Sequence, residues 1–483
     1  MRLRRALFAS PTKVIDTRKA VLQKQGFVLV VLLACIVRLA AAMNDFWLDE
    51  IWSYNIARQI DSMWGLIFTA HHDNNHILNT LYLYLLGDQY NWLWYRLLSI
   101  VTGTAVVVLI GRLACFHSLF EEGLVVWLTA ISFPLIVYSS EARGYAPAVF
   151  FAVLSFLLIE KRPNTLTMIC FWLAVFLGAL SHLTYCFIYL AILLMSFFST
   201  VKRNGLSSRS FAILMKWHGP PLFFLMFLYL VHVRHLIMGG WEVFSLPEVL
   251  DQTALLALGL PAGYFPDFLG IGIFCVLTGL GLFFLWRVGD DRWVFFLLAI
   301  IAAPALSIIV LRPQYLCPRY FLVCFPFFYL LLGRVLAKMH QDGGKAGRRF
   351  AIAMLVVFSI GHLSMSMNFL VFGRGGSLAA LNYMAEQNNG PDIFVGSDND
   401  FRIPKVLAFY MRYLPKEYKV IYFDRENWPK GGPTWLVLHN TDPKHQPKTR
   451  LHDREGHRTF RLEKTYPYGG VSGWNWYLYR IES

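Results

Sequence analysis

The sequence predicts a polytopic, all-α membrane domain followed by a small α/β domain at the C-terminus. Of the 483 residues, 56% are hydrophobic and only 15% are charged, and the mean hydropathy is +0.47, which is not typical of a soluble globular protein. Apolar runs near the length that crosses a bilayer, about 20 residues, recur along the chain. Beyond residue 372 they give way to short alternating segments, which indicate strands and helices of a separate domain.

Eleven apolar runs are candidate transmembrane helices, and we expect about eleven spans by the hydropathy criterion. The first run has no small-residue cleavage site, so we expect it to be retained as a signal anchor. The candidate spans are residues 26–44, 94–114, 123–139, 144–160, 166–183, 184–200, 218–237, 266–286, 293–311, 319–337 and 350–372.

Basic residues between the runs predict the orientation of the chain. If the N-terminal tail, residues 1–25, is cytoplasmic, the inside loops include Lys161 with Arg162 and the segment from Lys338 to Arg349. Cytoplasmic loops of membrane proteins carry an excess of Lys and Arg. The bias therefore predicts that the membrane domain, residues 26–372, begins with an outward crossing.

The first outer loop, residues 45–93, contains two short apolar pieces, Met63–Ala70 and Ile77–Leu86. Both are short for a span, so we expect helices that lie in the membrane interface. A crossing by residues 76–88 would invert every later loop and place the basic loops outside. We therefore predict that the whole loop stays on the outer face.

Beyond Phe372 the pattern is that of a small α/β domain, residues 373–483. A glycine-rich segment, Gly373–Ser377, is predicted to be a hinge-like linker. Because the domain follows the eleventh span, it would be extracytoplasmic. Helices are predicted at 378–387 and 403–414, and strands at 392–396, 419–423, 434–439 and 474–481.

Charge and cysteine content argue against several classes of protein. The net charge is +14, but basic loops of membrane proteins set topology and contact anionic headgroups, and no nucleic-acid-binding motif is present. The seven cysteines are an odd number and form no CxxC pair. This pattern is typical neither of a disulfide framework nor of a zinc site.

The stretch Met43–Tyr54 carries the first candidate catalytic groups. It follows the first apolar run and puts two adjacent carboxylates, Asp49 and Glu50, among interfacial aromatic residues such as Trp47. These residues alone leave two interpretations open. The carboxylates could be headgroup-level charges at a helix N-terminus, which acidic residues stabilise. Alternatively, one of them could accept a proton from an incoming hydroxyl group.

Further polar residues fall in turns on the same predicted face. They include Tyr138-Ser-Ser-Glu-Ala-Arg-Gly-Tyr145, Ser181-His182 and Pro318-Arg-Tyr320. A single arginine in such a turn commonly extends to lipid headgroups. Several such turns opposite a carboxylate pair favour a phosphate site, because arginine binds phosphate with paired hydrogen bonds. The turn arginines are Arg143, Arg312 and Arg319, with Arg234 as a further candidate.

The order of these motifs resembles that of the GT-C membrane glycosyltransferases. Asp49-Glu50 follows the first span, His76 precedes an apolar helix, and Glu141-Ala-Arg-Gly-Tyr145 follows the third run. The likeness covers residues 20–370 and is nearest to the bacterial branch related to protein O-mannosyltransferases and aminoarabinose transferases. It implies a GT-C membrane domain and a polyprenyl-phosphate sugar donor, which needs no nucleotide-binding loop.

The resemblance also implies roles for residues of this chain. Asp49 would be the general base, and Glu50 would assist by hydrogen bonding or by orienting the acceptor, so both are candidate catalytic residues. Arg143 and Arg319 would contact the donor phosphate. Relatives often have His-Pro-Pro where this chain has His76-Ile-Leu, which weakens the match there. The implied substrate-binding residues are His76, Tyr138, Glu141, Arg143, Tyr145, His182, Arg319 and Tyr320.

The cluster His71-His-Asp-Asn-Asn-His76 offers imidazole and carboxylate groups that could bind Zn or Mn. A polar turn that contacts headgroups or the acceptor is the commoner role of such a cluster, because histidine-rich tracts only suggest metal binding. We therefore assign no metal and no cofactor, although a divalent metal could bind without being required.

The sequence thus predicts a multi-pass enzyme of the bacterial cytoplasmic (inner) membrane, with its active site and C-terminal domain facing outward. As the resemblance implies, it would transfer a hexosyl or pentosyl group from a polyprenyl-phosphate sugar donor to a lipid, glycan or protein acceptor, with inversion. Its partners would be these substrates and membrane lipids, with no nucleic acid. The main alternative is a transporter or flippase of a lipid-linked saccharide, although transporters typically place polar residues at the bilayer midplane and have repeated halves. A non-catalytic scaffold is the third alternative, favoured only by the outer domain.

Overall fold

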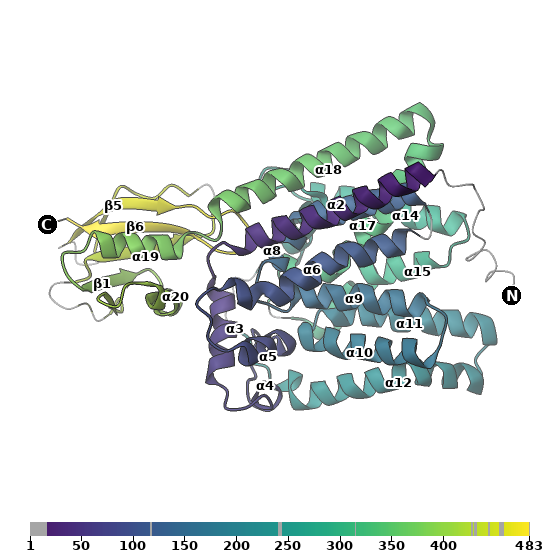
Figure 1. Ribbon diagram of the computed structural model, residues 1–483, viewed down its shortest axis with the longest axis horizontal. Helices are drawn as coiled ribbons and strands as arrows, with labels where there is room; N and C mark the ends of the chain where they lie inside the picture. Colours follow the sequence, from purple (N-terminus) through teal and green to yellow (C-terminus); the bar gives the residue numbers. More distant parts are fainter. Residues whose placement is uncertain are drawn as a thin grey trace.

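The computed structural model describes residues 17–482 except 116–117, 240–243, 314, 427, 429–431, 443–444 and 454–457. A long helical bundle is joined at one end to a mixed β-sheet (Figure 1). Most of the predicted N-terminal tail, residues 1–16, lies outside the described residues.

Helix occupies most of every predicted apolar run. The bundle comprises α2 (Thr17–Ala42), α6 (Leu93–Ala114), α7 (Leu119–Ile131), α8 (Phe133–Ser139), α9 (Tyr145–Glu160), α10 (Thr165–Ser181), α11 (Tyr185–Asn204), α12 (Ser208–Val231), α13 (Leu246–Leu258), α14 (Leu269–Arg287), α15 (Arg292–Leu297), α16 (Ala303–Leu311), α17 (Phe325–Asp342) and α18 (Gly344–Phe372). Within the described chain, eight helical segments are long and apolar enough to cross a membrane, and the bent pair α7 and α8 makes a ninth. The apolar helices α9 and α10 are shorter, at 16 and 17 residues. These helices confirm the multi-pass membrane fold.

The break between α7 and α8 bends the chain by 57°. Ser132 leaves helical geometry there, with φ −56° and ψ 112°. Side chains from other helices satisfy the backbone groups that the break exposes: Arg38 donates to the Ala130 carbonyl at 3.3 Å, and His362 Nδ1 accepts from the Phe133 N–H at 3.1 Å. The bend therefore determines where the loop after α8 lies.

Three short helices lie at the end of the bundle that carries the sheet: α3 (Leu48–Gln59), α4 (Gly65–Phe68) and α5 (Ile77–Leu86) (Figure 1). The last two match the non-spanning helices predicted in the first loop. The turn between α17 and α18 lies at the opposite end of the bundle (Figure 1). The first loop and the C-terminal domain therefore share one end of the molecule, and the basic segment 338–349 lies at the other.

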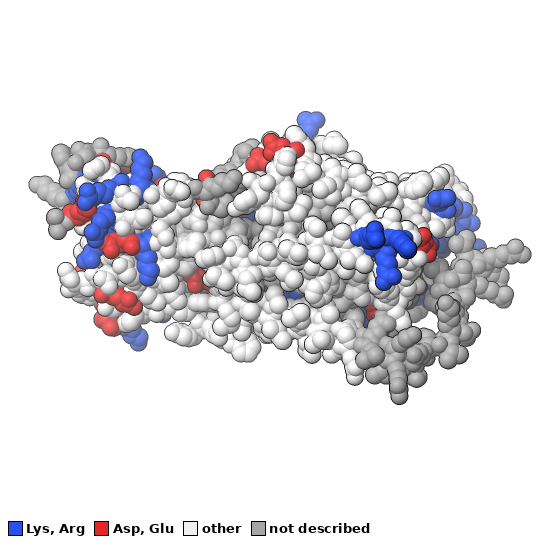
Figure 2. All heavy atoms as spheres, turned by 90° about the horizontal axis from the view of Figure 1, so that it is seen from above, with Lys and Arg blue, Asp and Glu red and all other residues white. Residues whose placement is uncertain are grey.

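The surface of the bundle has the character expected of a lipid-facing belt. Charged side chains gather toward the two ends of the face drawn in Figure 2, and most of the surface between them is uncharged. Large apolar side chains such as Leu29, Phe223 and Ile309 are exposed on the bundle helices. Lipid chains can cover such side chains without the free-energy cost that water would impose.

The C-terminal domain is a six-stranded mixed sheet with two helices. Its strands run in the order β2-β1-β3-β6-β5-β4, with β1 parallel to β2 and β3 and the remaining pairs antiparallel. The elements are α19 (Ser377–Glu386), β1 (Asp392–Ser397), α20 (Ile403–Tyr410), β2 (Lys419–Tyr422), β3 (Trp435–Asn440), β4 (Arg450–His452), β5 (Thr459–Tyr466) and β6 (Asn475–Ile481). Strands β4 and β5 were not predicted, because charged residues interrupt their apolar alternation.

The structure corrects the prediction that Gly373–Ser377 is a hinge. Gly373, Arg374 and Gly375 are buried. Gly375 has φ +112°, and a Cβ there would lie 2.0 Å from the Trp474 carbonyl oxygen. Glycine is therefore required here by a positive φ and by a close approach of two backbone segments, and it does not indicate a flexible linker.

The C-terminal domain shares one hydrophobic core with the first loop. Phe46 and Tyr54 pack against Phe409 of α20, and the Phe46 and Phe409 rings stack with centroids 5.2 Å apart. The Tyr410 hydroxyl donates to the Phe46 carbonyl at 2.7 Å. The Leu378 N–H at the start of α19 donates to Asp45 Oδ2 at 3.0 Å. The sheet domain is thus docked directly on the segment that leads into α3.

Candidate active site

Asp49 and Glu50 stand in the first turn of α3 and are buried, with 5% and 0% of their surfaces exposed. Their burial argues against the interpretation of solvated charges at headgroup level. Asp49 Oδ2 lies 2.7 Å from Arg143 Nη1 and 3.1 Å from Arg319 Nη1. Arg143 comes from the loop between α8 and α9, and Arg319 comes from the 3₁₀ helix η3 (Pro318–Cys324) before α17. Segments far apart in the sequence thus meet at one carboxylate.

The two carboxylate oxygens of Asp49 differ in their hydrogen-bond partners. Both guanidinium groups meet Oδ2, whereas no hydrogen bond from the described residues reaches Oδ1. Arg143 Nη2 donates to Asn74 Oδ1 at 2.7 Å, and the buried Arg143 Nε has no partner among the described residues. The Ser53 hydroxyl of α3 donates to the Asn74 carbonyl at 3.1 Å. Asn74 therefore ties the first loop to the arginine that holds Asp49.

Aromatic rings surround the two guanidinium groups. The Trp47 ring centroid lies 6.0 Å from Arg143 Cζ and 5.9 Å from Arg319 Cζ. Arg143 also lies over Tyr145, at 4.9 Å, and Tyr138 packs behind Tyr145 with centroids 5.1 Å apart. Rings at these distances attract cations through their quadrupoles. They also exclude water, which strengthens the ion pairs with Asp49.

Two histidines, the buried His76 and the partly buried His182, adjoin this cluster. His76 Nδ1 accepts a hydrogen bond from the Gly144 N–H at 2.9 Å. The centroid of the His182 ring lies 4.7 Å from that of His76, 4.4 Å from that of Tyr145 and 6.0 Å from that of Tyr320. Burial, reinforced by the two nearby arginines, lowers the pKa of His182 to about 3. Burial and the neighbouring His182 likewise hold the pKa of His76 well below its ordinary value. Both imidazoles are therefore neutral near pH 7, and the positive charge of the site comes from its arginines.

No protein-family model matches the sequence, and no curated protein matches it. Among solved structures, ArnT from Cupriavidus metallidurans in the apo state matches with a TM-score of 0.50 and 12% identity, over 94% of this chain and 97% of that chain. This chain has the GT-C fold. ArnT bound to undecaprenyl phosphate matches over the same shares of both chains at 12% identity, with a TM-score of 0.46. The oligosaccharyltransferase of Archaeoglobus fulgidus in the apo form matches with a TM-score of 0.47 and 12% identity, over 75% of this chain and 58% of that chain.

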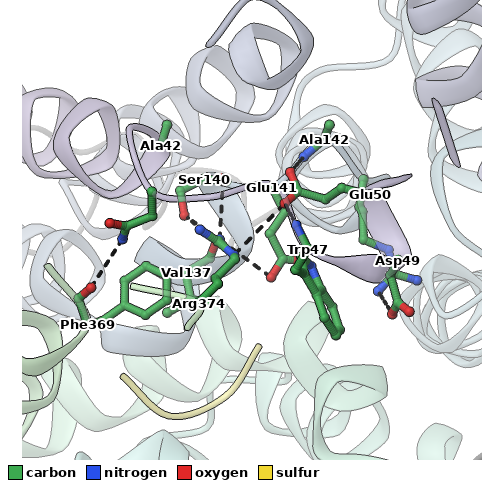
Figure 3. Close-up of polar contacts among 12 residues, drawn as sticks. Ala42, Trp47, Asp49, Glu50, Val137, Ser140, Glu141, Ala142, Phe369 and Arg374 are labelled. Carbon is green, nitrogen blue, oxygen red and sulfur yellow. Dashed lines mark hydrogen bonds and ion pairs between the residues drawn. The ribbon is translucent and has the colours of Figure 1, made fainter. Parts of the chain in front are cut away.

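Within this GT-C fold, Glu50 is held by four hydrogen bonds. Arg96 donates to Oε1 from Nε at 2.8 Å and to Oε2 from Nη2 at 2.6 Å. The Ala142 N–H donates to Oε1 at 2.7 Å, and the Trp47 N–H donates to Oε2 at 3.2 Å (Figure 3). The Trp47 contact also caps α3, as an acidic residue at a helix start can. Glu50 thus joins α3, α6 and the loop after α8.

A second buried carboxylate, Glu141, lies near Glu50. The Arg374 guanidinium stands between them, with Nη2 3.7 Å from Glu141 Oε1 and Nε 3.9 Å from Glu50 Oε2. Burial raises the pKa of Glu141, Arg374 opposes this shift, and the neighbouring Glu50 adds to it.

Sequence reasoning missed Asn74, Arg96 and Arg374. Arg96 stands at the start of the second apolar run, where a basic residue is usually interpreted as a headgroup anchor. Arg374 lies in the glycine-rich segment interpreted as a linker. Asn74 was within the histidine-rich motif but was given no role. A basic residue at the edge of a span was the only available signal for Arg96.

Two arginines of the sequence prediction lie away from the cluster, and part of the histidine-rich motif does so too. Arg312 and Arg234 are exposed, so they do not contribute to the site around Asp49. The histidine-rich motif is dispersed: His72 pairs with Asp73 at 2.9 Å, whereas His71 packs against His232 and His235. In the described part of the chain, no group of three or more His, Cys, Asp or Glu side chains is arranged to hold a metal ion.

Proposed function

We propose that this protein is a glycosyltransferase that moves a sugar from a polyprenyl-phosphate carrier to a lipid, glycan or protein acceptor at the outer face of the bacterial cytoplasmic membrane. The observation that carries the proposal is Asp49, buried on a GT-C fold, with Arg143 and Arg319 meeting one of its oxygens. A proton acceptor beside two phosphate-binding groups is the pair of functions that this transfer requires.

In this proposal, Arg143 and Arg319 hold the phosphate of the donor. Arginine matches phosphate with paired, charge-assisted hydrogen bonds. The buried Nε of Arg143 is a donor without a protein partner among the described residues. As the sugar leaves the carrier, the guanidinium groups stabilise the charge that remains on the phosphate.

Asp49 accepts the proton of the acceptor hydroxyl in the proposed reaction. Its Oδ2 is anchored by the arginines, and its Oδ1 receives no hydrogen bond from the described residues. The acceptor oxygen transfers its proton to Oδ1 and forms a bond to the anomeric carbon. The bond from that carbon to the carrier phosphate breaks, and the lipid phosphate leaves with the electron pair. A single displacement of this kind inverts the anomeric configuration.

The placement of charge supports an enzyme over a transporter. Transporters of lipid-linked saccharides need polar groups along a path through the membrane, near the midplane. Here Asp49, Glu50, Arg143 and Arg319 gather at the end of the bundle next to the sheet domain. Movement of a lipid-linked saccharide across vesicles without transfer to an acceptor would favour the transporter.

Substitution of Asp49 by Asn tests the general base. The change keeps size and one acceptor oxygen but removes the proton acceptor, so single-turnover transfer from a radiolabelled polyprenyl-phosphate sugar in nanodiscs should fall about 10² to 10⁴-fold. Asp267→Asn changes an exposed aspartate and should transfer at the wild-type rate. Sugar transfer by Asp49→Asn at the wild-type rate would show that Asp49 is not the general base.

Substitution of Arg143 or Arg319 by Lys tests the donor site. Lysine keeps the charge but loses the paired hydrogen bonds, so each variant should bind undecaprenyl phosphate more weakly than the wild type, by about 10-fold for one lost charge-assisted bond. The measurement is equilibrium binding in detergent. Arg312→Lys, at an exposed turn arginine, is the matched control and should bind normally. Equal affinity in all four proteins would mean that these arginines only support Asp49.

A further inference from the structure

Arg374 is a fully buried cation supplied by the segment that joins the bundle to the sheet domain. Figure 3 shows its guanidinium projecting toward Ser140, Glu141 and Glu50. Nη2 donates to Ser140 Oγ at 3.1 Å and lies 3.7 Å from Glu141 Oε1. Nε lies 3.9 Å from Glu50 Oε2. One side chain from the start of the C-terminal domain thus contacts the loop after α8 and faces the carboxylate that anchors α3.

Glu141 depends on this cation more than Glu50 does. Glu50 accepts four hydrogen bonds, whereas neither oxygen of Glu141 has a hydrogen-bond partner among the described residues. An ionised carboxylate without a countercharge is costly in a buried site. The titratable and charged groups that face Glu141 are Arg374, Glu50, Arg143, Arg96 and Tyr138.

The backbone around Arg374 is held by the sheet domain. The Gly469 N–H donates to the Gly373 carbonyl at 2.7 Å, and the Trp474 N–H donates to the Arg374 carbonyl at 3.3 Å. A Cβ on Gly473 would lie 2.4 Å from the Arg374 carbonyl oxygen, so the two segments are in close contact. The guanidinium therefore reaches Glu141 only when the sheet domain is docked.

The loop that Arg374 contacts also carries the arginine of the active site. Glu141 and Arg143 belong to one tight turn, in which the Arg143 N–H donates to the Glu141 carbonyl at 2.9 Å. A shift of this turn would move the Arg143 guanidinium away from Asp49 Oδ2, which it meets at 2.7 Å. Displacements of about 1 Å at a reacting centre can cost about 10²-fold in rate.

We infer that Arg374 is a positioning residue for the transfer reaction: it neutralises Glu141 and thereby holds the loop of residues 140–144 in the place where Arg143 meets Asp49. The inference rests on the proposed function and goes beyond it, because it makes the docked C-terminal domain part of the active site. Arg374 does not touch the substrates and acts through Glu141 and Arg143.

The first test compares turnover in Arg374→Gln with that of the wild type. Loss of the cation should lower kcat by about 10²-fold, while the KM for the acceptor changes little, because the acceptor contacts neither residue. Arg412→Gln is the matched control. Arg412 also links the sheet domain to α3, through the Tyr54 hydroxyl at 2.8 Å, but it does not contact the loop of residues 140–144. The control should keep the wild-type kcat.

The second test uses pH to separate charge neutralisation from simple packing. Burial raises the pKa of Glu141, and Arg374 opposes that shift, so removing Arg374 raises this pKa further. Below that pKa the neutral Glu141 needs no cation, whereas above it an unpaired carboxylate displaces the loop. The kcat of Arg374→Gln, relative to the wild type, should therefore fall as pH rises. Adding Glu141→Gln should abolish this fall and recover part of the lost turnover.

The outcomes separate the two proposals. If the wild type transfers sugar and Arg374→Gln has the wild-type kcat and pH profile, the positioning role is wrong while the function stands. If the double variant keeps the fall with pH, Glu141 is not the group that Arg374 neutralises, and the inference is also wrong. A wild type that transfers no sugar overturns the proposed function itself. Should Arg374→Gln not fold, Arg374→Lys decides: it keeps the positive charge and should therefore keep the wild-type pH profile, and a kcat that falls relative to the wild type as pH rises would overturn the inference.

Discussion

At the scale of residues, two adjacent carboxylates divide into different roles. Asp49 keeps an oxygen without a hydrogen bond from the described residues and meets two arginines from distant segments. Glu50 is fully buried, and hydrogen bonds occupy both of its oxygens. The residue pattern alone does not distinguish the pair, because their neighbours in the chain are the same, and only the family resemblance implied different roles for them. The two side chains leave the first turn of α3 in different directions, and this difference separates Asp49, the proposed base, from Glu50, the supporting residue.

Glu50→Gln should therefore act on stability. The amide would place a donor where Arg96 and two backbone N–H groups all donate, and it would leave Arg96 as a buried cation without its carboxylate. Breaking a buried ion pair in this way costs about 3–5 kcal/mol, so thermal unfolding in detergent should begin at a clearly lower temperature. Glu417→Gln, at an exposed position, should leave the transition unchanged. A Glu50→Gln protein that unfolds like the wild type would contradict the supporting role.

At the scale of elements, the site depends on how closely α9 and α10 approach at their ends. The loop after α8 enters α9 through Gly144, whose N–H donates to His76 Nδ1. A Cβ at this position would lie 1.8 Å from the Ser181 carbonyl oxygen and 2.9 Å from His76 Cβ. Only glycine fits between the end of α10 and the start of α5. The apolar pattern predicted the helices themselves but contained no signal for this approach.

Gly144→Ala should displace the turn that carries Arg143. The new methyl group cannot be accommodated without moving backbone, so turnover should fall by about 10²-fold, the cost of a displacement near 1 Å. Gly279→Ala in α14 is the matched control, since its Cβ would meet open space; turnover there should be unchanged. The measurement is single-turnover transfer by both purified variants, and an active Gly144→Ala protein would show that the turn tolerates movement.

At the scale of the whole molecule, the fold gathers the functional groups at one end. The bend between α7 and α8, the short helices of the first loop and the docked sheet domain all lie at that end (Figure 1). The basic turn between α17 and α18 lies at the other (Figure 1). The excess of Lys and Arg in such turns predicts that this end faces the cytoplasm.

Cysteine labelling of intact cells tests this orientation. In a variant without the native cysteines, Lys416→Cys in the sheet domain should react with a membrane-impermeant maleimide, and Gly343→Cys between α17 and α18 should react only after permeabilisation. Both positions are exposed, whereas Ser397 in the same domain is buried and would be a poor reporter. Labelling of Gly343→Cys alone in intact cells would invert the topology.

The sequence by itself determined the membrane class of the chain, the position of its long apolar helices and the α/β character of its last domain, and it pointed to the three segments that meet around Asp49; it did not predict α3 or α13. These properties follow from hydropathy, periodicity and loop charge, which depend only on neighbouring residues in the sequence and not on the fold. Tertiary structure alone decided that Asp49 and Glu50 are buried, that Arg312 stays outside the cluster, and that Asn74, Arg96 and Arg374 belong to it. A side chain's partner depends on which distant segments pack against it. The same arginine in a turn can therefore face lipid headgroups or a buried carboxylate, according to how the helices around it are arranged.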